Sequence, residues 1–326
     1  MPRLRICIFG AGAIGGWLGV LLAEAGHEVS MVARGAHLDA IRKYGCRLEI
    51  DGRVVTQHVR ASAQPADLGE QDYVVLATKT HALAGAAASV APLLGRDTAL
   101  VSTMNGVPWW FLHAVGGPAR GARLTSIDPD GAIGRALDPA RVLGVVIHAS
   151  SAVAAPGVIR KGGGNRVIIG EPDGSMSARL ERLHAALRAA GLGSETTRSI
   201  CAEIWAKLIG NLNFNPISAL VETTTDRLIA HPDAYALCVE TMREALAIAD
   251  KLGLRIDITP EQRIAVTAEL GAIRSSMLQD LDNRKPLEID ALVAAPCEIG
   301  RLVGVPTPHI DAVLALIRLK AALLGL

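Results

Sequence analysis

The stretch Leu4-Arg5-Ile6-Cys7-Ile8-Phe9-Gly10-Ala11-Gly12-Ala13-Ile14-Gly15 decides the fold of this chain. Its apolar run ends at Phe9, and the next six residues fit the pattern G-x-G-x-x-G, which predicts a strand followed by a tight turn. Residues 14–25 then predict a helix that ends at Gly26, and residues 28–33 predict a second strand. This β-α-β order indicates a Rossmann-type domain that binds a dinucleotide.

The glycine-rich loop is the expected cofactor site. The first glycine of the pattern permits the turn, the second lets the backbone approach a pyrophosphate, and the third allows close packing of helix on strand. The N-terminus of the helix adds amide donors for the anion. We therefore expect the cofactor to contact Gly10, Ala11, Gly12, Ala13, Ile14 and Gly15. The competing interpretation is a glycine-rich turn that binds no ligand.

The end of the second strand predicts which dinucleotide is bound. Chains that bind NAD usually place Asp or Glu there, to accept hydrogen bonds from the ribose. Here the strand ends Val32-Ala33-Arg34, and an arginine would pair with the 2′-phosphate of NADPH through its fork of donors. We expect NADPH to be held by Arg34 and approached by Lys79, which follows the predicted strand 73–77. A solvated loop arginine and a solvated lysine at a helix start are the alternatives.

The rest of the chain divides by its periodicity. Strand patterns continue to about residue 197, and the short strands 158–160 and 167–169, on either side of Gly162–Gly164, predict a hairpin. Beyond that point long helical patterns dominate: 203–214, 234–252, 260–271, 289–303 and 310–324. We therefore predict an α/β protein with an N-terminal Rossmann-type domain over residues 1–198 and a second, mainly α-helical domain over residues 199–326.

Composition excludes several classes of protein. The 326 residues carry a net charge of +1 and only 3% are aromatic, so neither nucleic acid nor an anionic membrane surface is an expected partner. The five cysteines are scattered without a C-x-x-C pair, which predicts buried thiols in a reducing, cytoplasmic setting and no metal site. The uncharged stretch 6–23 superficially resembles a secretory signal, but its glycines favour the strand, turn and helix described above.

Three polar residues in the second domain predict a catalytic helix. Lys207, Asn211 and Asn215 recur every four residues in an otherwise apolar helical pattern that we expect to end at Pro216, so they lie along one face. A lysine beside a nicotinamide can donate its proton to a carbonyl oxygen that receives hydride, and asparagines can orient that carbonyl. A solvent-facing polar stripe is the alternative.

The chain also resembles a known family. The pieces GAGAIGG (10–16), MNG (104–106), IWAKLIGNLNFNP (204–216), SSMLQD (275–280) and EID (288–290), in this order, are similar to ketopantoate reductase, also called 2-dehydropantoate 2-reductase. The resemblance spans about residues 4–310. It implies NADPH-dependent reduction of ketopantoate to pantoate, in the biosynthesis of pantothenate and coenzyme A. Alternatives are a related reductase of another small 2-keto acid and a non-catalytic sensor of NADPH.

The resemblance also implies roles for individual residues. Lys207 would be the general acid, with Asn211 and Asn215 lining the substrate site. Asn105 would lie between cofactor and substrate, and Ser276 would help to hold the substrate carboxylate. Glu288 would contact the substrate hydroxyl and the lysine, and we count it with Asn105 among the cofactor-binding residues. Arg34 and Lys79 match the family's NADPH-binding arginine and lysine.

Each implied role has a structural alternative. Asn105-Gly106 alone predicts a turn, and Ser276-Met277-Leu278-Gln279 fits a capping box. Glu288 follows Pro286 in the first turn of a predicted helix, where the helix dipole favours an acid. The run Val107-Pro108-Trp109-Trp110-Phe111 departs from the family pattern. It predicts either a bulky wall of the substrate pocket or packing between domains or at a dimer contact, and a homodimer is possible.

Overall fold

The computed structural model describes residues 2–326, and the chain forms two compact units. The first unit contains the residues up to Met104 together with Ala132–Ile200. The second contains Asn105–Gly131 together with Cys201–Leu326. The division at residue 200 lies close to the expected boundary at 198, but segment 105–131 packs with the second unit although its sequence neighbours belong to the first. The apolar contacts of this segment, described with the site, account for the difference.

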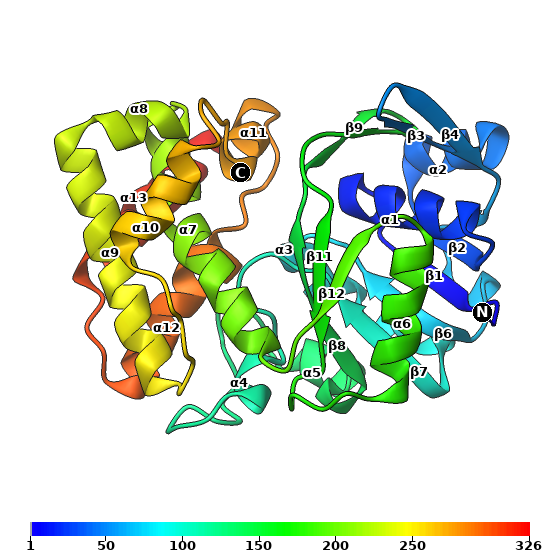
Figure 1. Cartoon of the computed structure of the whole chain (residues 1–326), viewed down its shortest axis with the longest axis horizontal. Helices are drawn as coiled ribbons and strands as arrows, with labels where there is room; N and C mark the ends of the chain where they lie inside the picture. The colour runs from blue at the N-terminus through cyan, green and yellow to red at the C-terminus, as the bar shows by residue number, and fades with distance from the viewer. Residues whose placement is uncertain (1) are drawn as a thin grey trace. The chain divides into compact units, whose positions relative to one another are not determined.

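The first unit is built on a sheet of eight strands in the order β12-β11-β8-β7-β6-β1-β2-β5 (Figure 1). Neighbouring strands run parallel, except that β8 and β11 are antiparallel. Parallel strands joined by helical crossovers are the Rossmann-type architecture that the sequence predicted, and this prediction is confirmed. The strands are β1 (Arg5–Phe9), β2 (Glu28–Val32), β5 (Arg60–Ser62), β6 (Gln71–Leu76), β7 (Leu94–Ser102), β8 (Val142–His148), β11 (Arg166–Gly170) and β12 (Gly193–Thr196).

A second sheet of four strands, in the order β4-β3-β10-β9, shows that the hairpin prediction was wrong. Its strands are β3 (Cys46–Ile50), β4 (Arg53–Gln57), β9 (Ser151–Ala155) and β10 (Val158–Lys161). Strand β10 pairs with β3 and β9, whereas β11 pairs with β8 and β12. The segment Gly162–Gly164 between β10 and β11 therefore connects the four-stranded sheet to the eight-stranded sheet. Short apolar strands do not reveal their partners, because pairing with distant strands is decided by tertiary packing.

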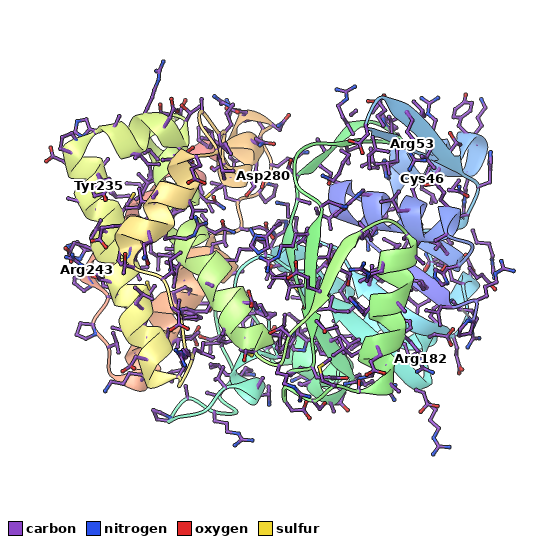
Figure 2. The ribbon with its side chains drawn as sticks, in the orientation of Figure 1. Cys46, Arg53, Arg182, Tyr235, Arg243 and Asp280 are labelled. Atoms are coloured by element: carbon purple, nitrogen blue, oxygen red, sulfur yellow. The ribbon has the colours of Figure 1, made fainter. Side chains whose placement is uncertain are left out.

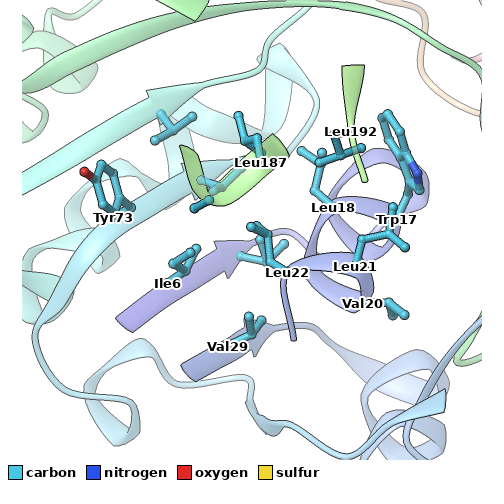
Figure 3. Close-up of a cluster of buried hydrophobic side chains, with 14 of the residues drawn as sticks. Ile6, Trp17, Leu18, Val20, Leu21, Leu22, Val29, Tyr73, Leu187 and Leu192 are labelled. Atoms are coloured by element: carbon cyan, nitrogen blue, oxygen red, sulfur yellow. The ribbon is translucent and has the colours of Figure 1, made fainter. Parts of the chain in front are cut away.

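Helix α1 (Ala13–Glu24) is the centre of the core of the first unit. Trp17, Leu18, Leu21 and Leu22 of this helix are buried with side chains from the sheet, as the close-up shows (Figure 3). The other helices of this unit are α2 (Gly35–Tyr44), α3 (Thr80–Ala86), α5 (Ala132–Ala136) and α6 (Ala178–Ala189). Burying so many large apolar side chains around α1 fixes where the loop before it must lie.

The second unit is helical, as the sequence predicted. Its elements are α4 (Phe111–Ala114), α7 (Ile200–Val221), α8 (Thr225–Ala230), α9 (Pro232–Lys251), α10 (Pro260–Ala268), α11 (Ser276–Asp282), a π-helical turn (Asp290–Ala294), α12 (Ala295–Val303) and α13 (Pro308–Leu324). Among residues 2–326, no helix is both long and apolar enough to cross a membrane.

Helix α7 continues past Pro216 to Val221, so its expected end at Pro216 was wrong. A proline inside a helix removes one backbone hydrogen bond and costs roughly 3 kcal/mol. Ile217, Ser218 and Ala219 after it are buried, and tertiary packing of such a segment offsets that cost.

Several exposed ion pairs lie on the surface of each unit. Figure 2 labels Arg243 on α9 and Arg53 on β4, and both side chains are exposed. Arg243 forms an ion pair with Glu240 at 2.6 Å, and Arg53 forms one with Glu24 at 2.8 Å. Such exposed pairs contribute little to stability, so the two cores carry most of it.

Candidate active site

The glycine loop has the geometry of a dinucleotide-binding turn. Gly10 has a φ of +106°, which side chains with a Cβ rarely adopt, and an added Cβ would lie 2.9 Å from Cγ2 of Thr78. Its backbone N–H and that of Ala11 donate to the carbonyl of Val32, at 3.2 and 3.1 Å. At Gly15 a Cβ would overlap the Gly10 carbonyl oxygen, so this glycine permits close packing of α1 on the loop.

Gly12 leaves room where a pyrophosphate would approach. It is the N-cap of α1, and a Cβ added there would meet nothing within 4 Å. In the described structure no side chain caps this end of the helix. Open space beside uncapped helical amides suits an anion, so the residues present fit a dinucleotide.

The two predicted phosphate-binding cations occupy comparable positions at the sheet. Arg34 is exposed, lies two residues after the end of β2 and is the N-cap residue of α2. Lys79 is exposed, follows β6 and is the N-cap residue of α3. Both therefore lie at the carboxyl ends of parallel strands, which is the edge where open α/β sheets bind their ligands.

His37 supports the glycine loop from α2, and no motif in the sequence identified it. Its Nε2 lies 2.7 Å from the carbonyl oxygen of Ala11, and its Nδ1 accepts a hydrogen bond from the N–H of Gly157 at 3.0 Å. This pattern requires the neutral ring with its proton on Nε2. One histidine thus joins the loop to the turn between β9 and β10, a long-range contact that no local motif predicts.

Lys207 lies in the middle of α7 with its side chain partly buried. Removal of its ammonium group from water lowers its pKa from 10.5 to about 8, although the nearby carboxylate of Glu288 acts to raise the pKa. Glu288 is itself partly buried just before the π-helical turn. The structure therefore brings together the lysine and the acid that lie far apart in the sequence.

The asparagines on the same face of α7 each contact another predicted residue. Nδ2 of Asn211 donates to Oδ1 of Asn105 at 2.9 Å, and Nδ2 of Asn215 donates to the hydroxyl of Ser276 at 3.3 Å. All these residues belong to the second unit. The polar stripe therefore faces partners, and the alternative of a purely solvent-facing stripe does not describe it.

The capping alternative for Ser276 belongs to its neighbour. Ser275 is the N-cap of α11, where its side chain accepts a hydrogen bond from the N–H of Leu278 at 3.1 Å. Ser276 is the first residue of the helix, and it is exposed. Its hydroxyl next to Asn215 is available to a ligand carboxylate.

The aromatic run after Asn105 packs inside the second unit. Trp109, Trp110 and Phe111 are at most 5% exposed. The ring of Phe111 stacks on Trp205 of α7 with centroids 5.6 Å apart, and the indole N–H of Trp205 donates to the carbonyl of Ala245 at 2.9 Å. Burial of these rings places segment 105–131 against α7 and α9, which favours a packing role over a pocket wall.

The chemistry available in the second unit is proton transfer to a polar substrate. A lysine whose pKa is about 8 is mostly protonated at neutral pH and gives up its proton readily, which is the property of a general acid. The amides of Asn105, Asn211 and Asn215 offer donors and acceptors that can orient a carbonyl or a carboxylate.

Comparison with known families finds one family along both units. The family described as "Ketopantoate reductase PanE/ApbA" matches residues 6–174, and "Ketopantoate reductase PanE/ApbA C terminal" matches residues 199–321. The second match begins close to the boundary at residue 200.

Individual proteins agree with this match. A 2-dehydropantoate 2-reductase of Mesorhizobium japonicum is 50% identical over 97% of this chain and 97% of its own length. The solved structure of a candidate ketopantoate reductase of Ralstonia solanacearum MolK2 has a TM-score of 0.96 at 49% identity, covering 100% of both chains. A 2-dehydropantoate 2-reductase of Geobacter metallireducens GS-15 has a TM-score of 0.85 at 27% identity, covering 97% of this chain and 100% of its own.

Proposed function

The chain belongs to the ketopantoate reductase family, and from this premise we propose that it reduces 2-dehydropantoate, or ketopantoate, to pantoate with NADPH, as a step in the biosynthesis of pantothenate and coenzyme A. The observation that carries the proposal is the cluster in the second unit. There the carboxylate of Glu288 acts to raise the pKa of Lys207, and the amide of Asn211 donates a hydrogen bond to that of Asn105. A sensor of NADPH has no need of a proton donor with a lowered pKa, whereas a ketone reductase does.

The roles of the residues follow from their chemistry. The glycine loop, Arg34 and Lys79 would hold NADPH, which would supply the hydride for the keto carbon. Lys207 donates its proton to the keto oxygen as negative charge develops there. Asn105 and Asn211, joined by their hydrogen bond, orient the keto group. Glu288 raises the pKa of Lys207 and so maintains the protonated form.

The remaining groups account for the two ends of ketopantoate. Ser276 and Asn215 present a hydroxyl and an amide side by side, which suits the substrate carboxylate. Glu288 suits the terminal hydroxyl, because a carboxylate accepts a strong hydrogen bond from it. A keto acid of the same shape without that hydroxyl would leave this acceptor unpaired in a partly buried site.

The test compares kcat/KM for ketopantoate and for 2-keto-3,3-dimethylbutyrate, which lacks the hydroxyl. We expect the analogue to react more slowly by roughly 10-fold or more, because a charged hydrogen bond is lost. In Glu288→Gln the gap between the two substrates should shrink. If kcat/KM for the analogue equals that for ketopantoate, the substrate is another 2-keto acid and the proposed substrate is wrong.

The expectations for partners and location stay predictions. We propose that a small 2-keto acid and NADPH are the ligands, that nucleic acid and membrane are not bound, and that the enzyme acts in the cytoplasm, with a homodimer possible. Light scattering of the purified protein tests the oligomeric state, and fractionation of cells that produce it tests the location.

A further inference from the structure

The π-helical turn Asp290–Ala294 lies two residues after Glu288, and it contains a carbonyl that the helix cannot use. The backbone N–H of Ala295 donates to the carbonyl of Asp290, five residues earlier. In this register the next donor would be residue 296, which is proline and has no N–H. The carbonyl of Ala291 is thereby left without its helical donor.

That carbonyl holds the turn that carries Asn105. The N–H of Val107 donates to the Ala291 oxygen at 2.9 Å. Gly106 makes the approach possible, since its φ is +82° and a Cβ at this position would overlap the same oxygen. One residue earlier, the side chain of Asn105 accepts the hydrogen bond from Asn211. The backbone of the π-helical turn therefore sets the place of the Asn105 amide.

Two further contacts tie the same segment down, so the turn is not a loose loop. Phe111 stacks on Trp205 of α7. The carboxylate of Glu298 on α12 accepts hydrogen bonds from the N–H groups of Thr125 and Ser126, at 2.7 and 2.9 Å. With both ends of the segment anchored, the bond between Val107 and Ala291 adjusts the position of Asn105 locally.

We propose that the π-helical turn Asp290–Ala294, which Pro296 follows, is a positioning element of the active site. Gly106 and Pro296 are then positioning residues that act through Asn105. The inference rests on the proposed function. A single stretch, residues 288–291, carries both the carboxylate that acts on Lys207 and the carbonyl that fixes Asn105. One backbone segment therefore places both Glu288, which acts on Lys207, and Asn105, which orients the keto group. π-helical turns are frequent at functional sites.

Pro296→Ala is the first variant. Alanine restores an N–H that can donate to the Ala291 carbonyl, where it competes with the N–H of Val107, or to the Leu292 carbonyl in the α-helical register, where it competes with the π register. We expect the thermal midpoint to stay level or rise, because a helical proline is replaced by a good helix former. We expect kcat to fall by roughly 10-fold, because a misplaced orienting group slows the reaction, whereas the Kd for NADPH should not change.

Gly106→Ala is the second variant, and it has a matched control. We expect it to lower kcat by about 10- to 100-fold, since the added methyl group displaces the turn from Ala291. Gly253→Ala is the control, because Gly253 also has a positive φ, of +71°, but a Cβ there meets nothing within 4 Å. It imposes a similar backbone cost in the same unit and should leave kcat unchanged.

Two readouts separate positioning from a general structural effect. In an Asn105→Ala background, Pro296→Ala should cause no further loss of kcat, because the two residues act through one group. Hydrogen exchange should be slow at the Val107 amide in the wild type and faster in Pro296→Ala. Additive losses of kcat, or an unchanged exchange rate at Val107, would overturn the inference.

The exchange measurement also keeps this inference distinct from the proposed function. If the wild type fails to reduce ketopantoate with NADPH, the proposed function fails. The exchange rate of Val107 in Pro296→Ala still decides whether the π-helical turn holds the Asn105 segment.

Discussion

Lys207 owes its properties to two opposing effects. Burial of its ammonium group favours the neutral amine, and the negative charge of Glu288 favours the ammonium ion, which together give a pKa of about 8. At pH 7 the lysine is then about nine-tenths protonated, yet it loses its proton far more easily than a solvated lysine. The sequence placed Lys207, Asn211 and Asn215 on one helical face through simple periodicity. Their partners Asn105, Ser276 and Glu288 came from the family resemblance, because no spacing rule connects residues so far apart.

The pH profile of the reaction should report this balance. For the reduction, kcat should be level below the pKa of Lys207 and fall as pH rises above about 8, because the deprotonated lysine cannot supply the proton. Glu288→Gln removes the negative charge that raises the pKa, so the fall should begin at lower pH. Steady-state rates across the neutral and alkaline range, with saturating NADPH, measure both profiles. An identical pH profile for the two proteins would show that Glu288 does not raise the pKa of Lys207.

Lys207→Met should exchange activity for stability. The folded protein lowers the pKa of this lysine from 10.5 to about 8, so the unfolded chain binds more protons and the charged lysine opposes folding at neutral pH. That cost is present below pH 8 and disappears as pH rises toward 10.5. We expect the variant to unfold at higher urea concentration at neutral pH, with kcat lowered by roughly 10²- to 10⁴-fold. A variant with near-normal turnover would remove Lys207 from the proton-donor role.

Arg34→Ala should discriminate between the two nicotinamide cofactors. Loss of charge-assisted hydrogen bonds to the 2′-phosphate should weaken NADPH binding by roughly 10- to 100-fold, with little change for NADH. Fluorescence titration of both cofactors measures the effect. Arg47→Ala, which removes an exposed arginine of β3, controls for net charge. Equal losses for NADPH and NADH would show that Arg34 does not bind the 2′-phosphate.

Among the elements, α7 connects most parts of the second unit. Its polar face carries the predicted catalytic groups, and Trp205 joins it to segment 105–131 and to α9. The helical periodicity predicted most of α7, but not its continuation beyond Pro216, because burial of Ile217, Ser218 and Ala219 outweighs the local preference. The π-helical turn could not be foreseen either, since a proline in a helical pattern predicts a kink without identifying which carbonyl it leaves unpaired.

Trp205→Phe tests this connecting role. It removes the hydrogen bond to Ala245 and part of the stack on Phe111, so we expect the free energy of unfolding to fall by about 1–3 kcal/mol. Urea denaturation with a constant m-value measures the loss. Tyr235→Phe on α9, where the side chain is only partly buried (Figure 2), is the matched aromatic control. Equal effects of the two substitutions would contradict the anchoring role of Trp205.

At the scale of the whole molecule, the two units are not two consecutive lengths of chain. The second unit takes Asn105–Gly131 from the middle of the first. The change of periodicity predicted a boundary near residue 198. Segment 105–131 shows no change of composition that would predict its place in the second unit. Tertiary contacts assign the segment to the helical unit: Phe111 stacks on Trp205, Val107 donates to Ala291, and Thr125 and Ser126 donate to Glu298.

The place of segment 105–131 in the second unit predicts how fragments of the chain fold. A fragment of residues 201–326 lacks the segment that covers Trp205, so we expect it to show no cooperative thermal unfolding. A fusion of residues 105–131 to residues 201–326 through a flexible linker should recover a cooperative transition. Circular dichroism during heating measures both. A cooperative transition in the shorter fragment would show that the helical unit folds without the segment.

Segment 105–131 also sets a waiting time during synthesis. Trp109, Trp110 and Phe111 leave the ribosome well before Trp205, the residue on which Phe111 stacks. At a translation rate of 5–20 residues per second, the roughly 75 residues between the end of the segment and Trp205 take about 4–15 seconds. Three large apolar rings stay uncovered throughout this interval. The nascent chain should therefore depend on a chaperone that holds apolar segments, and slower translation between residues 131 and 205 should increase aggregation.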